Sequence, residues 1–273
     1  MKVGFIQFSP LFGEKEKNIS KSVELITKGA EADLLVLPEL CNTGYLFIDM
    51  SELKRLGEEA PNGSTLKAWQ KIAEETDTYL VAGFCEKKNN DFYNSAVLIA
   101  PDGYMDVYQK IHLFDAEKNF FQAGNGPLKV YDIGKTKIGI IVCFDWIFPE
   151  ITRILALNGA EIICHPANLV LPFAQKTMLA RSIENRIFTI TANRIGQDVR
   201  PNNSLKFTGL SQITNPKMEL LIKASKDKEE VGIIEIDPSL ARNKMVTSNN
   251  HIFQDRRIEL YQSLIKSNRN QNK

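Results

Sequence analysis

Two short apolar runs constrain the fold of this chain more than any other feature. Residues 33–38 read DLLVLP, and residues 137–144 read KIGIIVCF. The first run stops at a proline and is typical of a strand buried on both faces, and the second run also predicts a strand. Segments with a helical period separate such strands along the whole chain. Buried strands that alternate with helices, with hairpins between them, predict a mixed-sheet α/β domain.

The other elements follow from the same periodicities. One helix shows apolar residues at Ile19, Val23, Ile26 and Ala30, and further helices are predicted over residues 62–76, 149–159 and 174–186. Further strands are predicted over residues 3–8, 78–86, 93–100, 104–109, 161–165, 188–193, 207–214, 219–223 and 231–236. Pro101-Asp102-Gly103 predicts a hairpin turn. Together these elements predict one domain over residues 1–262 and a polar, frayed tail over residues 263–273.

Charge and cysteine content exclude several classes of function. The chain has 34 basic and 33 acidic residues and a net charge of +1, which argues against a polybasic surface for nucleic acid or membranes. No stretch approaches the roughly 18 apolar residues of a membrane span, and the N-terminus lacks a signal peptide's apolar core. Four cysteines without a C-x-x-C pair predict reduced thiols in a cytoplasmic protein, and three scattered histidines argue against a metal site.

Cys143 is the first candidate for chemistry. In α/β folds the reactive groups lie at the carboxyl ends of strands, and Cys143 ends an apolar run six residues before a predicted helix. A sharp strand-to-helix turn projects a nucleophile and leaves backbone N–H groups free for an oxyanion. A thiol with a pKa of about 8.5 needs activation to attack at neutral pH. The alternative is a buried cysteine that acts as a small apolar residue, as we assume for Cys41, Cys85 and Cys164.

Glu39 and Lys110 end two other predicted strands. Glu39 directly follows the buried run, where desolvation would raise its pKa toward the range of a general base. Lys110 could stabilise a thiolate and then the oxyanion of a tetrahedral intermediate. Taken singly, each could be a solvated surface charge. Sequence spacing alone cannot bring residues 39, 110 and 143 together.

Three segments resemble the nitrilase, or carbon–nitrogen hydrolase, superfamily. They are LPELCNTGY (37–45), YQKIHLFDAEKNFFQAG (108–124) and GIIVCFDWIFPE (139–150). Glu39, Lys110 and Cys143 fall on the positions of that family's Glu–Lys–Cys triad, in the same chain order. The similarity covers nearly the whole chain. It is strongest to small archaeal-type nitrilases, which share CxDWxFPE and a later GAEII-HPANLV stretch.

The resemblance implies a four-layer αββα sandwich. It also implies a homodimer with an eight-layer core, in which the C-terminal segment crosses to the partner. Glu117 matches a second family glutamate that positions Lys110 or the substrate, although a residue favoured in the first turn of a helix is the alternative. By the same resemblance Tyr45, Asn168 and Phe144 would bind substrate, the last through its backbone N–H in the oxyanion hole. His112 and His165 are expected to be structural.

The expected activity is hydrolysis of a non-peptide carbon–nitrogen bond in a small amide or nitrile. It would proceed through a cysteine thioester, or first a thioimidate for a nitrile, and release ammonia without a metal or organic cofactor. An N-carbamoyl substrate is the alternative, and a catalytically idle scaffold of the same fold is another. Residues 144–147 (FDWI) differ from those of well-defined branches such as the ω-amidases, so the substrate stays open. The turn at residues 215–218 (NPKM) also departs from the family's usual P-x-G turn.

Overall fold

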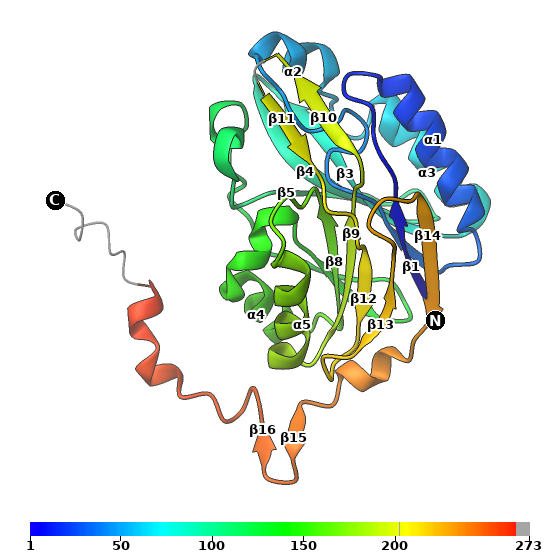
Figure 1. Ribbon diagram of the computed structural model, residues 1–273. Helices are drawn as coiled ribbons and strands as arrows, with labels where there is room; N and C mark the ends of the chain where they lie inside the picture. The colour runs from blue at the N-terminus through cyan, green and yellow to red at the C-terminus, as the bar shows by residue number, and fades with distance from the viewer. Residues whose placement is uncertain (202, 266–273) are drawn as a thin grey trace, which may run out of the picture.

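The computed structural model describes residues 1–201 and 203–265. Two six-stranded sheets face each other, and helices cover the outer face of each (Figure 1). This arrangement confirms the predicted α/β class and the four-layer αββα sandwich. Among the described residues, no helix combines the length and the apolar character that crossing a membrane requires.

The first sheet has the strand order β14-β1-β2-β3-β4-β5. Its strands are β1 (Lys2–Gln7), β2 (Leu34–Val36), β3 (Tyr79–Lys88), β4 (Asp91–Ile99), β5 (Met105–Gln109) and β14 (Glu230–Glu235). Strands β1, β2 and β3 are parallel, and the others pair antiparallel with their neighbours. The helices α1 (Lys15–Lys28) and α3 (Ser64–Thr76) cover its outer face, and α2 (Met50–Leu56) lies near its end (Figure 1).

The second sheet has the strand order β13-β12-β9-β8-β7-β6. Its strands are β6 (Val130–Asp132), β7 (Lys137–Ile140), β8 (Ile162–Ala167), β9 (Phe188–Asn193), β12 (Gln212–Thr214) and β13 (Leu220–Lys223). Here β7, β8 and β9 are parallel, so each sheet has a parallel centre with antiparallel edges. The helices α4 (Pro149–Leu157) and α5 (Ala174–Asn185) cover its outer face (Figure 1).

Strand β2 shows why an unbroken apolar run suits this architecture. Successive side chains of a strand point to opposite faces. Leu34 and Val36 pack in the cluster between the sheets, and Leu35 and Leu37 pack under α1 and α3 with Trp69. All five are fully buried. Because both faces of the strand are covered, apolar residues are needed at every position, as predicted.

The structure corrects two predicted strands. The apolar run at residues 137–144 forms a strand only as far as Ile140, and Cys143 begins a 3-10 helix, η2 (Cys143–Ile147). The predicted strand 207–214 shrinks to β12, because Gly209 and Leu210 have positive φ angles of 59° and 58°. Both stretches are largely buried yet bend sharply. The sequence pattern therefore predicted burial correctly and extended backbone wrongly.

Several short elements were not predicted. They include α2, β6, the hairpin β10 (Gln197–Arg200) with β11 (Asn203–Lys206), and the pair β15 (Met245–Thr247) with β16 (Asn250–His251). Beyond β16 the chain forms an arm that projects away from the two sheets (Figure 1). The arm carries the short 3-10 helices η4 (Ile258–Leu260) and η5 (Gln262–Ile265). The predicted frayed tail begins inside η5, and residues 266–273 lie outside the described part.

Candidate active site

Lys110, Glu39 and Glu117 form one buried cluster. The Lys110 Nζ lies 2.7 Å from the Oε1 of Glu39 and 2.7 Å from the Oε1 of Glu117. Lys110 and Glu39 are fully buried, and Glu117 is 5% exposed. The three residues come from different segments: the end of β2, the end of β5 and the 3-10 helix η1 (Asp115–Asn119). The folded chain therefore brings together three charges that sequence spacing could not join.

A close backbone contact places Glu39. The N–H of Gly83 on β3 donates to the carbonyl of Pro38 at 3.0 Å, and the N–H of Cys41 donates to the carbonyl of Gly83 at 3.0 Å. A Cβ atom at Gly83 would lie 2.4 Å from the Cα of Glu39. Leu40 has a φ of 44°, which turns the chain immediately after the carboxylate. Glu39 is thus held by backbone packing rather than by an ordinary strand end.

Neutral polar side chains hold both carboxylates. Asn94 on β4 donates from Nδ2 to the Oε1 of Glu39 at 2.6 Å, and the Tyr45 hydroxyl donates to the Oε1 of Glu117 at 2.6 Å. Asn168 donates from Nδ2 to the backbone carbonyl of Glu39 at 2.9 Å. Among the described residues, the buried Oε2 of Glu39 has no hydrogen-bond partner. That oxygen remains available to accept a proton.

The backbone of Cys143 is strained and firmly held. Its φ is 40°, a left-handed value that is rare for a residue other than glycine. Asp145 accepts the N–H of Val142 at 2.9 Å and the hydroxyl of Tyr108 at 2.7 Å on the same oxygen. On the other side, the Nε2 of His165 lies 3.0 Å from the carbonyl oxygen of Cys143. Side chains from β5, β8 and η2 itself thus fix the turn that presents the thiol.

The electrostatics of the cluster keep the thiol protonated and the lysine charged. Burial raises the pKa of the Cys143 thiol well above its ordinary value, and Glu39 raises it further, while Lys110 opposes both. Burial alone would lower the pKa of Lys110, but Glu117 and Glu39 outweigh it and raise that pKa. Burial also raises the pKa of Glu117, which Lys110 opposes. The thiol therefore needs a base before it can attack, and Glu39 is a carboxylate beside it.

The structure places the remaining predicted residues around this cluster. Tyr45 is 9% exposed, Asn168 is 2% exposed, and Asn168 lines a small cavity together with Cys143 and Phe144. His165 contacts the backbone of Cys143, as a structural histidine would. His112 contacts the same turn through Asp145, because its Nδ1 lies 2.9 Å from the Oδ1 of Asp145. The catalytic and binding roles of the predicted residues stay predictions.

Sequence reasoning missed Asn94 and Asp145. Asn94 lies in YNSAVLI, where a buried amide in an apolar strand was the available signal. Asp145 follows Cys143 by two residues, and its burial could not be read from a run that was predicted to be extended. The part of the chain that the structure describes holds no group of three or more His, Cys, Asp or Glu side chains that could bind a metal ion.

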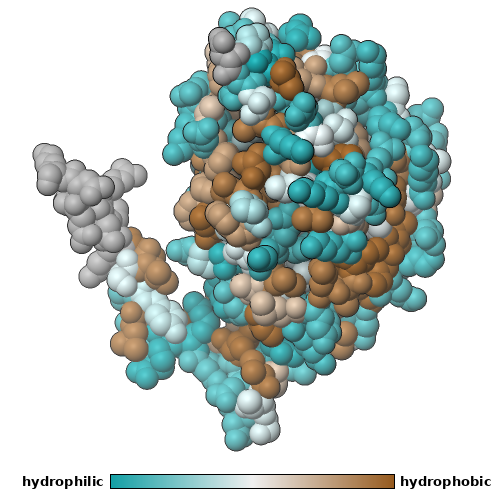
Figure 2. Space-filling model, in the orientation of Figure 1, coloured by the Kyte–Doolittle hydropathy of each residue, from teal (hydrophilic) through white to brown (hydrophobic). Residues whose placement is uncertain are grey.

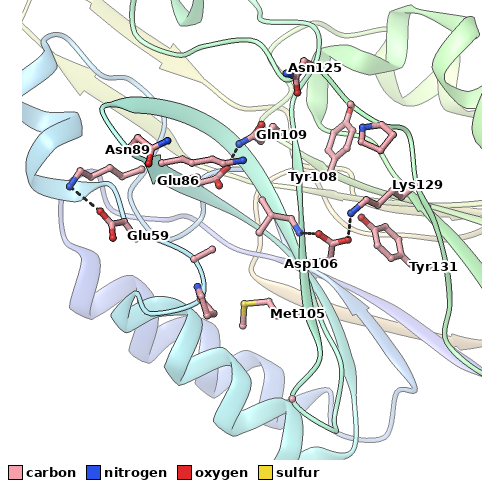
Figure 3. Close-up of a pocket in the computed structure, with 18 residues that line it drawn as sticks. Glu59, Glu86, Asn89, Met105, Asp106, Tyr108, Gln109, Asn125, Lys129 and Tyr131 are labelled. Atoms are coloured by element: carbon pink, nitrogen blue, oxygen red, sulfur yellow. Dashed lines mark hydrogen bonds and ion pairs between the residues drawn. The ribbon is translucent and has the colours of Figure 1, made fainter.

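A hollow much larger than the space at Cys143 lies elsewhere, along the edge strand β5. Its volume is about 760 Å³, and Figure 3 shows Glu86, Gln109, Asp106 and Lys129 in its wall. These polar groups are paired: Lys129 contacts Asp106 at 2.6 Å, and Gln109 donates to Glu86 at 2.9 Å. Neither Cys143 nor Lys110 lines this cavity. We therefore place the candidate active site at the buried cluster and not at this larger hollow.

Comparisons with known proteins show what this chain is similar to. A family model described as carbon-nitrogen hydrolase matches residues 2–244. A nitrilase of Pyrococcus abyssi is 45% identical over 263 residues, which cover 96% of this chain and 99% of that protein. An (R)-stereoselective amidase of a Pseudomonas species is 30% identical, with 95% and 93% covered. The crystal structure of a carbon-nitrogen hydrolase from Helicobacter pylori G27 superposes with a TM-score of 0.87 at 26% identity, covering 97% and 98% of the two chains.

We predict that His165 makes the free energy of unfolding decrease at acidic pH. Burial lowers its pKa from 6.5 to about 4 in the folded state, so between these values the unfolded chain binds a proton that the folded chain does not. Stability should fall as the pH decreases through this window, by up to about 3 kcal/mol from this residue. His165→Gln keeps a donor toward Cys143 but does not titrate. In urea unfolding between pH 7 and 4, the free energy of unfolding should fall less with decreasing pH for the variant than for the wild type. An equal fall in both proteins would contradict the assignment.

Proposed function

The chain belongs to the carbon–nitrogen hydrolase family, and from that premise we propose that it hydrolyses a small amide or nitrile and releases ammonia. The observation that carries the proposal is the buried lysine between two carboxylates beside a buried thiol. A charged cluster of this kind costs several kcal/mol of desolvation, which a purely structural role would not require. Two relatives, described as a nitrilase and an amidase, support the same class of substrate.

The proposed reaction starts with proton transfer from Cys143 to Glu39. The thiolate forms a bond to the carbonyl carbon, and the negative charge on the oxygen is held by Lys110 and the backbone N–H of Phe144. Glu39 returns the proton to nitrogen, the carbon–nitrogen bond breaks, and ammonia leaves a thioester. Water then gives a proton to Glu39 as it attacks the thioester, the carbon–sulfur bond breaks, and Glu39 passes the proton to sulfur, which releases the carboxylic acid and restores the free thiol.

A nitrile would need one additional intermediate before it reaches the same thioester. Attack of the thiolate on the nitrile carbon gives a thioimidate after the nitrogen takes the proton. Addition of water to the thioimidate gives a tetrahedral species, from which ammonia leaves to form the thioester described above. No step in either branch requires an oxidant, a reductant or a metal ion. One cluster of residues can therefore serve both substrates.

Glu117 is proposed to position Lys110. Its Oε1 approaches the lysine Nζ at the same distance as Glu39 does, and Tyr45 fixes that oxygen from the other side. Glu39 alone would leave the ammonium free to move as the carboxylate gains and loses its proton. With Glu117 as a second anchor, Lys110 keeps its place when Glu39 is neutral.

The placement of the residues argues against an idle scaffold. A scaffold would not need a buried ion pair of Lys110 with Glu39 whose charges act on the buried Cys143 thiol. An N-carbamoyl substrate would use the same cluster, and no described contact favours it over an amide. The small space at the thiol favours a small acyl group. We also infer a cytoplasmic enzyme, because all four cysteines are free and the reaction needs a reduced thiol.

We infer that the enzyme is a homodimer. On the side of α4, the apolar side chains of Ile147, Ile154 and Leu157 are 39% to 42% exposed. The projecting arm carries four further exposed apolar residues: Ile258, Leu260, Leu264 and Ile265. Figure 2 shows brown, hydrophobic atoms along this arm. Exposed apolar surface on a projecting segment is typical of an interface. A second copy would cover both surfaces.

The first prediction tests the reaction. Purified enzyme should release ammonia from at least one compound in a panel of short amides, nitriles and N-carbamoyl compounds. Cys143→Ala should reduce the rate to background with an unchanged thermal unfolding midpoint, because loss of the thiol leaves only a small cavity. Cys164→Ala, at another buried free cysteine, serves as the matched control and should keep most of the activity. Ammonia release by Cys143→Ala at more than a few per cent of the wild-type rate would contradict the proposed nucleophile.

A second prediction concerns the shape of the cation at position 110. Lys110→Arg keeps the charge, but a planar guanidinium cannot place one nitrogen 2.7 Å from both carboxylates in a fully buried site. We expect kcat to fall by about 10²-fold or more, as when an oxyanion contact is lost. The matched control is Lys129→Arg on the distant rim of the large cavity, whose kcat should stay at the wild-type value. A near-normal Lys110→Arg enzyme would leave Lys110 only a long-range electrostatic role.

A third prediction tests the assembly. Two chains of 30.8 kDa give a mass of about 62 kDa, which multi-angle light scattering at micromolar concentration should report. A multiple of that mass would keep the dimer as the building block. A single peak at the mass of one chain would show that the exposed apolar residues of α4 and the arm do not bind a second copy.

A further inference from the structure

Two small cavities lie on either side of one aromatic ring. The first, of about 10 Å³, is lined by Cys143, Phe144, Trp146 and Asn168, with Phe114 in its wall. The second, of about 90 Å³, is lined by Tyr45, Glu117 and a group of apolar side chains, again with Phe114 in its wall. Among the described residues, Phe114 alone lines both cavities. Phe114 is therefore the wall that the space at the thiol shares with the larger space beside Glu117.

The first cavity is too small for a whole substrate. A volume of 10 Å³ is about what a single water molecule needs. The reacting carbon, oxygen and nitrogen of an amide already exceed it, so the rest of the acyl chain must reach further. The second cavity is the adjoining space, and its lining suits an alkyl chain: Phe47, Phe120, Phe121 and Leu205. The chain can enter that space only past Phe114.

The position of Phe114 is tied to the charged cluster. Its N–H donates to the Oε2 of Glu117 at 3.2 Å, and its carbonyl accepts the N–H of Glu117 at 2.9 Å. Its ring packs against Phe144, with the ring centroids 5.0 Å apart. The next residue, Asp115, has a φ of 45°, so the turn after the ring is strained. The ring is thus held by the same carboxylate that positions Lys110.

We propose that Phe114 is a specificity-determining residue that limits the length of the acyl chain. Short chains need only a small shift of the ring, and longer chains must displace it fully from Phe144 to reach the larger cavity. This inference rests on the proposed function, since it names the size of the substrate that the same site accepts. Phe114 touches the acyl chain and takes no part in proton transfer. Its removal should therefore change selectivity more than the chemistry of the shortest substrate.

The experiment compares kcat/KM for propionamide and hexanamide in the purified enzyme. Phe114→Ala joins the two cavities and should raise the ratio of hexanamide to propionamide by at least about tenfold, with Phe114→Leu between it and the wild type. Phe253→Ala is the matched control, because it removes the same ring at a position that lines neither cavity. Its ratio should stay within about twofold of the wild type. An unchanged ratio in Phe114→Ala, or an equal shift in Phe253→Ala, would overturn the proposal.

A labelling measurement separates this inference from the proposed reaction. The Cys143 thiolate displaces iodide from iodoacetamide or from the bulkier N-phenyl-iodoacetamide, and Glu39 takes the thiol proton. We divide the labelling rate of Cys143 with iodoacetamide by its rate with N-phenyl-iodoacetamide, and divide this ratio by the same ratio for glutathione. In the wild type the resulting value should exceed one, which means a preference for the small reagent. Phe114→Ala should reduce that preference by about tenfold. If no amide or nitrile is hydrolysed, the proposed function fails while this ratio still decides the role of Phe114. Equal preference in both proteins would refute it, with Phe114→Leu used if the alanine variant does not fold.

Discussion

The fully buried ammonium of Lys110 is the interaction on which the rest of the site depends. A charge removed from water is tolerated only when opposite charges and hydrogen bonds replace the lost hydration. Glu39 and Glu117 supply the charge, each at 2.7 Å, and Asn94 and Tyr45 supply the hydrogen bonds that keep these carboxylates in place. Residues of four separate segments must therefore arrive together. The first sheet provides this, because β2, β4 and β5 all belong to it and η1 follows β5 in the chain.

Three residues with a strained backbone adjoin this cluster. Leu40, Asp115 and Cys143 each have a positive φ although none is glycine, and each adjoins or belongs to the proposed machinery. Such conformations cost on the order of 1–3 kcal/mol and persist only where the surroundings determine them. At Cys143 the surroundings are the hydrogen bonds of Asp145 and His165. The positive φ turns the chain out of the strand direction at Cys143, whose thiol lies within electrostatic reach of Lys110.

The proposed chemistry and the proposed selectivity share one loop. The turn that places Glu117 against Lys110 also holds the ring of Phe114 beside the cavity at Cys143. A change in that turn would therefore alter both the position of the cation and the space open to the acyl chain. Glu39 and Lys110 lie at strand ends, and Glu117 and Phe114 lie together on the loop that contains η1.

The sequence by itself determined the layers of the fold and the identity of the charged residues. The unbroken run at residues 33–38 required a strand covered on both faces, because every second side chain points to the opposite layer. The motifs carried Glu39, Lys110, Glu117 and Cys143 to positions that the fold then brought together. Only the tertiary structure decided that the apolar run before Cys143 stops being a strand at Ile140, that Asn94 holds Glu39 while Asp145 holds the turn at Cys143, and that Phe114 lines both cavities. These features depend on contacts between segments distant in sequence, and local pattern contains no information about such contacts.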